Sequence, residues 1–255
     1  MASRHAQPIA QHAAEFAALY AVTTFVFTRM KLFDTRPHMA AARVASAVHA
    51  TITFLRAAKL TDMHTLASPA KFASSVGMRE NTEADEKLLH ISCGYFLYDL
   101  LYIFLCERDI KFVIHHLISL TVWGTTLNAG RGCELANCCL LMGESTTPIL
   151  NAWWLAKQAG HERLARGLSR IFTAGFLGVR VAILPFYVVP FANEALRGED
   201  LEKRVGTLRA RLWAALVVLS MFGGLVWARS LVRGLLKDLR KGKRQIQAKP
   251  RAKQS

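Results

Sequence analysis

Charged residues are scarce in this 255-residue chain, and acidic ones are the scarcer kind. Asp, Glu, Lys and Arg make up 20% of the sequence, whereas 52% is hydrophobic. A soluble domain of this length spreads its charge over the surface, but here the charges gather in short clusters between apolar runs of about twenty residues. This pattern indicates a membrane protein, and it excludes a chain that is disordered throughout.

Motifs of soluble enzymes and metal proteins are missing as well. The sequence has no phosphate-binding or dinucleotide-binding glycine motif. Its five cysteines are too few for a disulfide-stapled secreted module and lack the paired C-x-x-C spacing of a zinc site. The nine histidines include one adjacent pair, His115 and His116, but none of the spaced histidine boxes of membrane di-iron enzymes. We therefore expect neither a metal ion nor a bound cofactor.

The apolar runs predict an all-α membrane protein with about seven spanning helices. They lie at roughly 9–28, 38–58, 88–106, 112–129, 133–156, 168–190 and 211–230, and each is long enough to cross the hydrocarbon core. The chain then divides into an N-terminal helix with its loop (1–37), a six-helix domain (38–235) and a basic tail (236–255). The first run differs from a cleaved signal peptide, because its basic residues follow it and no small-residue cleavage site comes next. The loop at 59–87 is expected to hold at most one short helix.

Lys and Arg, counted on the two sides of the membrane with the buried Arg180 left out, are distributed unevenly. The side that includes the C-terminus holds 20 Lys and Arg, and the side that includes the N-terminus holds 12. The positive-inside rule places the richer side in the cytosol, which predicts a lumenal N-terminus and a cytosolic C-terminus. Eight basic residues and one acidic residue lie in the tail from Lys237 to Ser255. A nucleic-acid-binding arm is an alternative, but the same rule explains this tail, so we expect membrane lipids and no nucleic acid as partners.

Polar side chains inside the spans recur at helical spacing, which places them on faces directed away from lipid. Three such stripes are Ser46, His49, Thr53 and Arg56; Tyr95, Asp99 and Tyr102; and Glu134, Asn137, Glu144, Pro148 and Asn151. Pro148 should kink the fifth span and free a backbone carbonyl near Glu144. The stripes predict a central cavity. For their Ser, Thr and Asn members, a polar seam that only joins helices is an equal alternative.

Four polar residues of the predicted spans lie at similar depth. At 1.5 Å per residue, His115 and His116 are about 5 to 6 Å from the cytosolic face, Asn151 about 8 Å and Asp99 about 10 Å. An Asp beside a His can fix the imidazole tautomer and raise its basicity, which gives a general base or a nucleophile. His115, His116 and Asp99 are therefore candidate catalytic residues, with purely structural histidines as an equal alternative.

Two charged residues, Glu144 and Arg180, fall near the middle of the membrane. Arginine cannot shed its charge, so a guanidinium at this depth requires a partner. We predict a salt bridge from Arg180 to Glu144 or, if the helices are rotated otherwise, to Asp99.

The order of these motifs resembles the TLC domain, which is shared by ceramide synthases, translocating-chain-associated membrane proteins and the small TLC-domain-containing proteins. The resembling segments are Arg43-Val44-x-Ser46-x-x-His49, Gly94-Tyr95-Phe96 with Tyr98-Asp99, Asp109-x-x-Phe112-x-x-His115-His116, and Glu144-x-x-x-Pro148-x-x-Asn151 with Trp153 and Trp154. The resemblance covers about residues 40–235. It implies six spans around a central cavity, residence in the endoplasmic reticulum or another endomembrane, and a role in lipid metabolism.

Resemblance to ceramide synthases implies that His115 and His116, with Asp99, transfer an acyl group from coenzyme A to a long-chain base. The chain departs from those enzymes in the fifth span. They carry two aspartates three residues apart and then Leu-Glu, whereas this chain reads Met142-Gly143-Glu144-Ser145-Thr146-Thr147-Pro148. The pattern is closer to the small TLC-domain-containing proteins, which are linked to membrane lipid composition and mostly lack an assigned reaction.

We therefore expect a protein of lipid homeostasis that binds, senses or processes a lipid in an intramembrane cavity. The expected cavity residues are Tyr95, Glu144, Asn151, Arg180 and His49. The alternative is an N-acyltransferase with acyl-CoA as co-substrate. A transporter or scramblase is a third reading of the polar stripes, although no broken helix pair or internal repeat supports it in the sequence.

Overall fold

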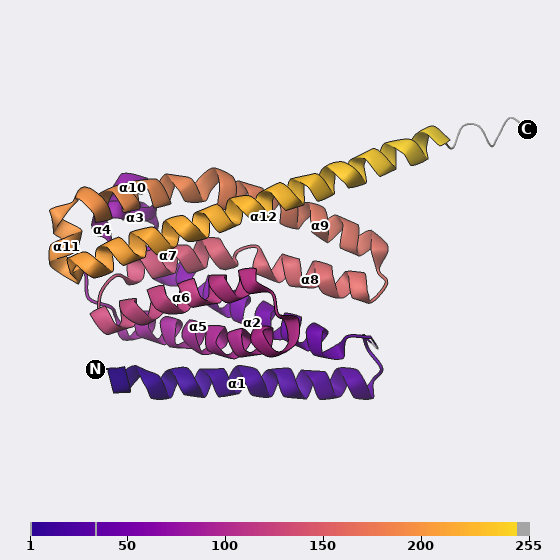
Figure 1. Cartoon of the computed structure of the whole chain (residues 1–255), viewed down its shortest axis with the longest axis horizontal. Coiled ribbons are helices and arrows are strands. Elements are labelled where there is room, and N and C mark those ends of the chain that lie inside the picture. The colour runs from indigo at the N-terminus through magenta and orange to yellow at the C-terminus, as the bar shows by residue number, and fades with distance from the viewer. Residues whose placement is uncertain (1, 34, 249–255) are drawn as a thin grey trace, which may run out of the picture.

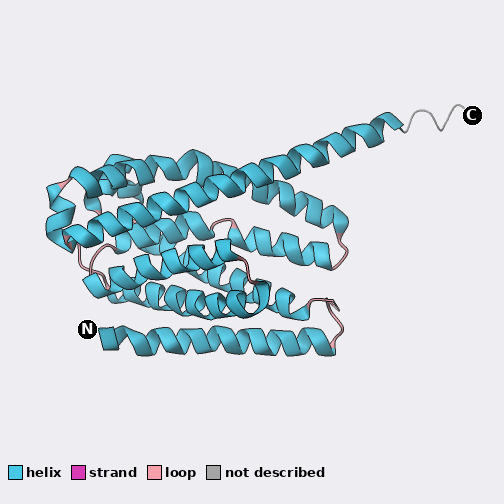
Figure 2. Cartoon of the chain, viewed as in Figure 1, coloured by secondary structure: helices cyan, strands magenta, loops and turns pink. Residues whose placement is uncertain are grey.

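The computed structural model describes residues 2–33 and 35–248, with side chains for 4–33 and 35–237. Part of the basic tail predicted at 236–255 thus lies outside the described residues. The helices are α1 Ala2–Arg29, α2 Pro37–Leu60, α3 Met63–Leu66, α4 Pro69–Ser75, α5 Glu83–Tyr102, α6 Ile110–Ala129, α7 Cys133–Glu144, α8 Thr147–Gln158, α9 Glu162–Phe176, α10 Leu184–Arg197, α11 Glu199–Val205 and α12 Thr207–Ala248, with π-helical segments η1 Ile103–Glu107 and η2 Leu177–Ile183. In the described ranges no strand occurs, which confirms the predicted all-α class (Figure 2).

The long helices run along one common direction (Figure 1). α1 forms one edge of the bundle and packs against α2 and α5, while α12 crosses the opposite edge against α10. The α1–α2 and α8–α9 connections lie at the end toward which α12 extends, and α3, α4 and α11 lie at the other end with the N-terminus (Figure 1). The first turn of α1 and the last turn of α12 therefore lie at opposite ends of the bundle.

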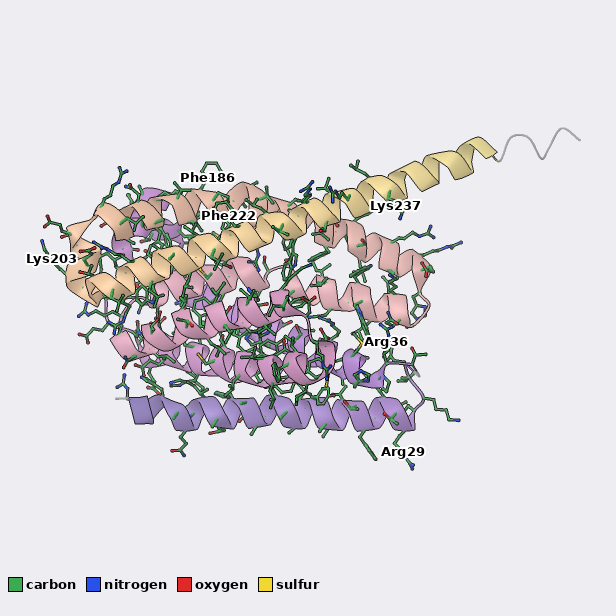
Figure 3. All side chains as sticks on the ribbon, in the orientation of Figure 1. Arg29, Arg36, Phe186, Lys203, Phe222 and Lys237 are labelled. Carbon is green, nitrogen blue, oxygen red and sulfur yellow. The ribbon has the colours of Figure 1, made fainter. Side chains whose placement is uncertain are left out.

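Four helical segments are long and apolar enough to cross a membrane: Glu83–Glu107, Ile110–Ala129, Glu162–Arg197 and Thr207–Lys237. Large apolar side chains also cover the outer surface, where Phe186 is 67% exposed and Phe222 is 56% exposed. Figure 3 shows both on the side of the bundle, with Lys203 at one end and Arg29 and Arg36 at the other. Such a surface is costly in water but suits a lipid bilayer. These features indicate a multi-pass membrane protein.

The three remaining predicted spans do not combine sufficient length with sufficient hydropathy. α1 has 28 residues and α2 has 24, but both are more polar than the four apolar segments. The predicted fifth span is divided into α7 and α8, each of 12 residues. Its interruption at Ser145 and Thr146 directly precedes Pro148, whose ring and missing N–H cannot continue the helical hydrogen bonds. The kink predicted from Pro148 is therefore a complete break, visible in Figure 1.

The connection between α2 and α5 contains two short helices, α3 and α4, where at most one was expected. Each begins with a capping side chain, because Asp62 accepts from the His64 N–H and Ser68 accepts from the Lys71 N–H. Further on, the buried Asp85 carboxylate accepts hydrogen bonds from Arg79 at 3.1 Å and from Asn137 at 2.9 Å. The hydrogen bond to Asp85 raises the pKa of Arg79, which keeps this guanidinium charged. These contacts hold the connection against α5 and α7.

Candidate functional site

A cavity of about 270 Å³ lies between the helices near the α7–α8 break. Polar side chains from α2, α5, α6, α7, α8 and the α7–α8 connection line one part of it, namely Arg43, Ser46, Tyr95, Asp99, His115, His116, Glu144, Thr146, Thr147 and Asn151. Apolar side chains from α9 and α12 line another part: Phe172, Phe176, Trp227 and Leu231. Such a lining suits an amphipathic ligand.

A smaller pocket of about 60 Å³ continues from this cavity. The two share Phe96, His115, Gly143, Glu144 and Arg180 as lining residues. Beyond these shared residues the smaller pocket is mostly apolar, with Ile118, Val122, Trp123, Leu140, Leu184 and Val217 among its walls. The polar residues His115, Glu144 and Arg180 thus border both spaces.

His116 is held by hydrogen bonds at both ring nitrogens. Its Nδ1 lies 2.7 Å from the Phe112 carbonyl oxygen, and its Nε2 lies 2.8 Å from Asp99 Oδ2. A carbonyl oxygen only accepts, so Nδ1 carries a hydrogen and donates it. One further proton is shared between Nε2 and the carboxylate, which leaves the pair uncharged overall. With both nitrogens engaged, His116 has no lone pair directed into the cavity.

His115 differs from its neighbour, because within the described part of the chain neither of its ring nitrogens has a hydrogen-bond partner. Its ring borders both the cavity and the smaller pocket. Phe96 packs edge-on against it with ring centroids 6.2 Å apart, and the Trp227 ring lies 6.3 Å away. The adjacent histidines therefore divide their roles: His115 can contact a ligand, and His116 is fixed by Asp99.

The structure brings Tyr95, Asp99, His115, His116, Glu144, Asn151 and Arg180 to the same cavity. His49, which the sequence also suggests as a cavity residue, is not among the lining residues. Its buried ring stacks on the outer side of Tyr95 with centroids 4.0 Å apart and an interplanar angle of 11°. Its Nδ1 lies 3.9 Å from Glu144 Oε1. His49 thus supports the cavity wall from behind.

The predicted salt bridge of Arg180 is wrong. Among the residues that the structure describes, no carboxylate oxygen lies within 4.0 Å of its guanidinium. Arg180 Nη2 instead donates to the Gly143 carbonyl oxygen at 2.8 Å, and the guanidinium lies 5.9 Å from the centre of the Phe176 ring. The α7–α8 break exposes this carbonyl, and a side chain at Gly143 would crowd Arg180, since a Cβ there would lie 3.3 Å from Nη2.

Several residues that line the cavity had no predicted role there. Arg43 donates to Glu107 at 3.2 Å and lies over the Trp154 ring, which joins α2 to the end of η1. Glu107 follows the predicted third span, so hydropathy alone gave it no role. Phe176 and Trp227 look like lipid-facing residues in the sequence, because apolar residues facing a cavity and apolar residues facing lipid have the same periodicity.

Fold and cavity together define a helical, multi-pass membrane protein with an internal amphipathic site. The TLC domain family profile matches residues 40–233, and the chain belongs to this family. The predicted resemblance to the TLC domain is thereby confirmed.

Individual relatives are TLC domain-containing proteins. The chain is 30% identical over 156 residues to TLC domain-containing protein 4 of Xenopus tropicalis, which covers 58% of each chain. It is 34% identical over 106 residues to TLC domain-containing protein 4-B of Danio rerio, which covers 38% of this chain and 39% of the relative. The matches therefore span less than two thirds of these relatives. The similarity to small TLC-domain-containing proteins agrees with the pattern at Glu144, Pro148 and Asn151.

Proposed function

We propose that this protein binds a membrane lipid in the cavity beside the α7–α8 break and acts in membrane lipid homeostasis in the endoplasmic reticulum or another endomembrane. The observation that carries this proposal is the amphipathic lining of the cavity. Phe172, Phe176 and Leu231 offer contact to an acyl chain, while His115 and Asn151 offer hydrogen bonds to a polar headgroup. A lipid combines these two properties in one molecule, and membership of the TLC domain family supports such a role.

The proposal includes seven spans, six of them around the cavity. Supporting it, the long helices α1 and α2 and the joined pair α7–α8 run alongside the four apolar segments (Figure 1). α2 carries Arg43 and His49 toward the interior, and this lowers its hydropathy without exposing charge to lipid. α1 would be the additional span before the six of the TLC domain. The end of the bundle that lies nearer to the cavity would then face the cytosol.

An N-acyltransferase is the second candidate function. In that reaction the acyl group of an acyl-CoA thioester passes to the amine of a long-chain base, and free coenzyme A is released. The ring of His115, with neither nitrogen bonded to the described part of the protein, favours this candidate, since a general base or nucleophile needs a free nitrogen. His116 and Asp99 would position it. Against it, the fifth span lacks the aspartate pair of ceramide synthases.

Lipid binding is tested by mass spectrometry of the protein purified in mild detergent. Leu150 lines the cavity, so Leu150→Trp should fill part of it and reduce the bound lipid several-fold. The matched control is Leu164→Trp, because Leu164 is 55% exposed on the outer surface of α9. Both variants must keep a wild-type elution profile in size-exclusion chromatography. A wild-type protein that carries no lipid, or equal lipid in both variants, would contradict binding in this cavity.

Acyl transfer is tested separately with acyl-CoA and sphinganine. A binding protein is expected to show no N-acyl product above the background of a mock preparation. Clear product formation by the wild type, lost in His115→Ala, would replace lipid binding by the acyltransferase as the function of this site. The loss in His115→Ala is informative only if the variant still binds lipid or unfolds at the wild-type temperature.

A further inference from the structure

Among the residues that the structure describes, Arg180 forms no salt bridge, although the Glu144 carboxylate lies in the same cavity wall. Arg180 lies in η2 and borders both the cavity and the smaller pocket. Its Nε is shielded from solvent and has no hydrogen-bond partner, while Nη2 donates only to the Gly143 carbonyl. The Glu144 carboxylate borders the same two spaces but lies beyond salt-bridge distance of Arg180, and its Oε1 is 3.9 Å from His49 Nδ1. A guanidinium in this setting favours an anion as its partner.

The beginning of α8 provides a second group for the same anion. Its N-cap residue, Thr146, makes no side-chain capping hydrogen bond, and Thr146 and Thr147 both line the cavity. The first N–H groups of a helix and its dipole favour negative charge, and in α8 these groups belong to Thr147 and Ile149, because Pro148 has no N–H. The 12-residue α8 is long enough for this effect, and its first turn borders the same cavity as Arg180.

One turn further along α8, a buried amide lacks part of its hydrogen bonding. Asn151 is 1% exposed and lines the cavity; its Nδ2 donates to Ser46 at 2.9 Å, whereas Oδ1 has no partner among the described residues. An amide oxygen only accepts, so it calls for a donor such as a hydroxyl group. Thr147 and Asn151 share one helix face, about 6 Å apart along the axis at 1.5 Å per residue. A phosphate and a hydroxyl of one headgroup can span that distance.

From this arrangement we infer that the bound lipid is a monoanionic phospholipid with a hydroxylated headgroup, of the phosphatidylglycerol or phosphatidylinositol kind. Its phosphate lies between Arg180 and the start of α8, and a headgroup hydroxyl donates to Asn151 Oδ1. The inference rests on the proposed function, because it names the lipid class that the same cavity takes. The inference predicts that the protein distinguishes lipids by their headgroup when their acyl chains are the same.

The first test compares three dioleoyl lipids that differ only in the headgroup. Purified protein is incubated with equimolar phosphatidylglycerol, phosphatidylmethanol and phosphatidylcholine in mixed micelles, and bound lipid is counted by native mass spectrometry. We expect phosphatidylglycerol to exceed phosphatidylcholine by about tenfold, the effect of one charge-assisted interaction. Phosphatidylmethanol has the charge without the hydroxyls and should fall between them. Equal binding of all three overturns the inference, and equal binding of the two anionic lipids overturns the assigned contact at Asn151.

The second test uses variants of the charge. Arg180→Gln should bring the ratio of phosphatidylglycerol to phosphatidylcholine close to one, and Arg180→Lys should keep most of it. Arg166→Gln is the matched control, because Arg166 is an exposed residue of α9 that contacts only a backbone carbonyl of its own helix. If the ratio of phosphatidylglycerol to phosphatidylcholine is unchanged in Arg180→Gln, the inference is overturned, but the proposal that the cavity binds a lipid is not. Absence of every lipid from the wild type contradicts the proposed function itself, and a misfolded Arg180→Gln leaves the headgroup comparison on the wild type as the deciding result.

Discussion

At the scale of single residues, the Asp99 and His116 pair determines how the two adjacent histidines differ. The Phe112 carbonyl fixes a hydrogen on Nδ1, so Nε2 of a neutral His116 can only accept. Asp99 must then donate to it as a protonated acid, or the pair must be an imidazolium and a carboxylate. In either state His116 remains fixed and His115 remains available to a ligand.

Substitution of Asp99 separates these two states. Asparagine can donate from Nδ2 to Nε2, so if His116 is neutral, Asp99→Asn should lower the stability by less than about 1 kcal/mol. Asp99→Ala leaves a buried acceptor without a partner and should cost about 1–3 kcal/mol. Thermal unfolding in detergent measures both. If Asn and Ala destabilise the protein equally, the carboxylate charge is essential, and the pair is an imidazolium and a carboxylate.

Residue-scale prediction from the sequence succeeded where helical periodicity is regular. Counting in steps of three and four places Tyr95 and Asp99 on one face of α5, and both line the cavity. The partner of Arg180 could not be predicted in this way, because Arg180 lies in a π-helical segment. Hydrogen bonding from i to i+5 changes the direction in which successive side chains leave the helix, so a 3.6-residue period no longer applies.

At the scale of helices, α1 depends on one glycine for its contact with α5. A Cβ on Gly94 would lie 2.5 Å from His12 Cβ and 2.8 Å from the backbone nitrogen of Ala13. Backbone atoms cannot yield as a flexible side chain can, so any larger residue at position 94 must push the two helices apart. This close approach also aligns Arg4 with Glu86 at 2.7 Å and His5 with His90 at 2.9 Å.

Gly94→Ala is therefore expected to destabilise the protein, by about 1–3 kcal/mol as for other overpacked positions. Helix propensity alone predicts the opposite, a gain of about 1 kcal/mol for Ala over Gly. Gly124→Ala in α6 is the matched control, because nothing lies within 4 Å of a Cβ added there. Thermal unfolding of the two variants in one detergent gives the comparison. A Gly94→Ala protein as stable as Gly124→Ala would show that α1 does not pack closely against α5.

Helix positions were more predictable than helix continuity. The predicted span at 112–129 nearly coincides with α6, because a long apolar run without proline permits little else. The predicted span at 133–156 does not reveal where α7 ends. A proline alone allows either a kink or a break, and the choice depends on contacts such as the one from Arg180 to the exposed Gly143 carbonyl, which sequence spacing does not contain.

At the scale of the whole molecule, the helical bundle includes one helix, α1, that the family match leaves out. The TLC domain match covers residues 40–233 and thus begins after α1. Nevertheless α1 is integrated into the core through Phe16, which is 7% exposed and packs on Tyr95 with ring centroids 5.2 Å apart. Tyr95 in turn lines the cavity. The helix outside the matched domain therefore supports the cavity wall from behind.

The orientation of the molecule in the membrane follows from its ends and its charges. The N-terminal part of α1 and the C-terminal part of α12 lie at opposite ends of the bundle (Figure 1). With Arg180 left out, 20 Lys and Arg fall on the C-terminal side and 12 on the other. We therefore predict an N-terminal tag in the lumen and a C-terminal tag in the cytosol. In sealed microsomes a protease should remove only the C-terminal tag, and detergent should make both accessible as the control. Removal of both tags before detergent would mean an even number of spans, and protection of the C-terminal tag would contradict the orientation inferred from the charge difference.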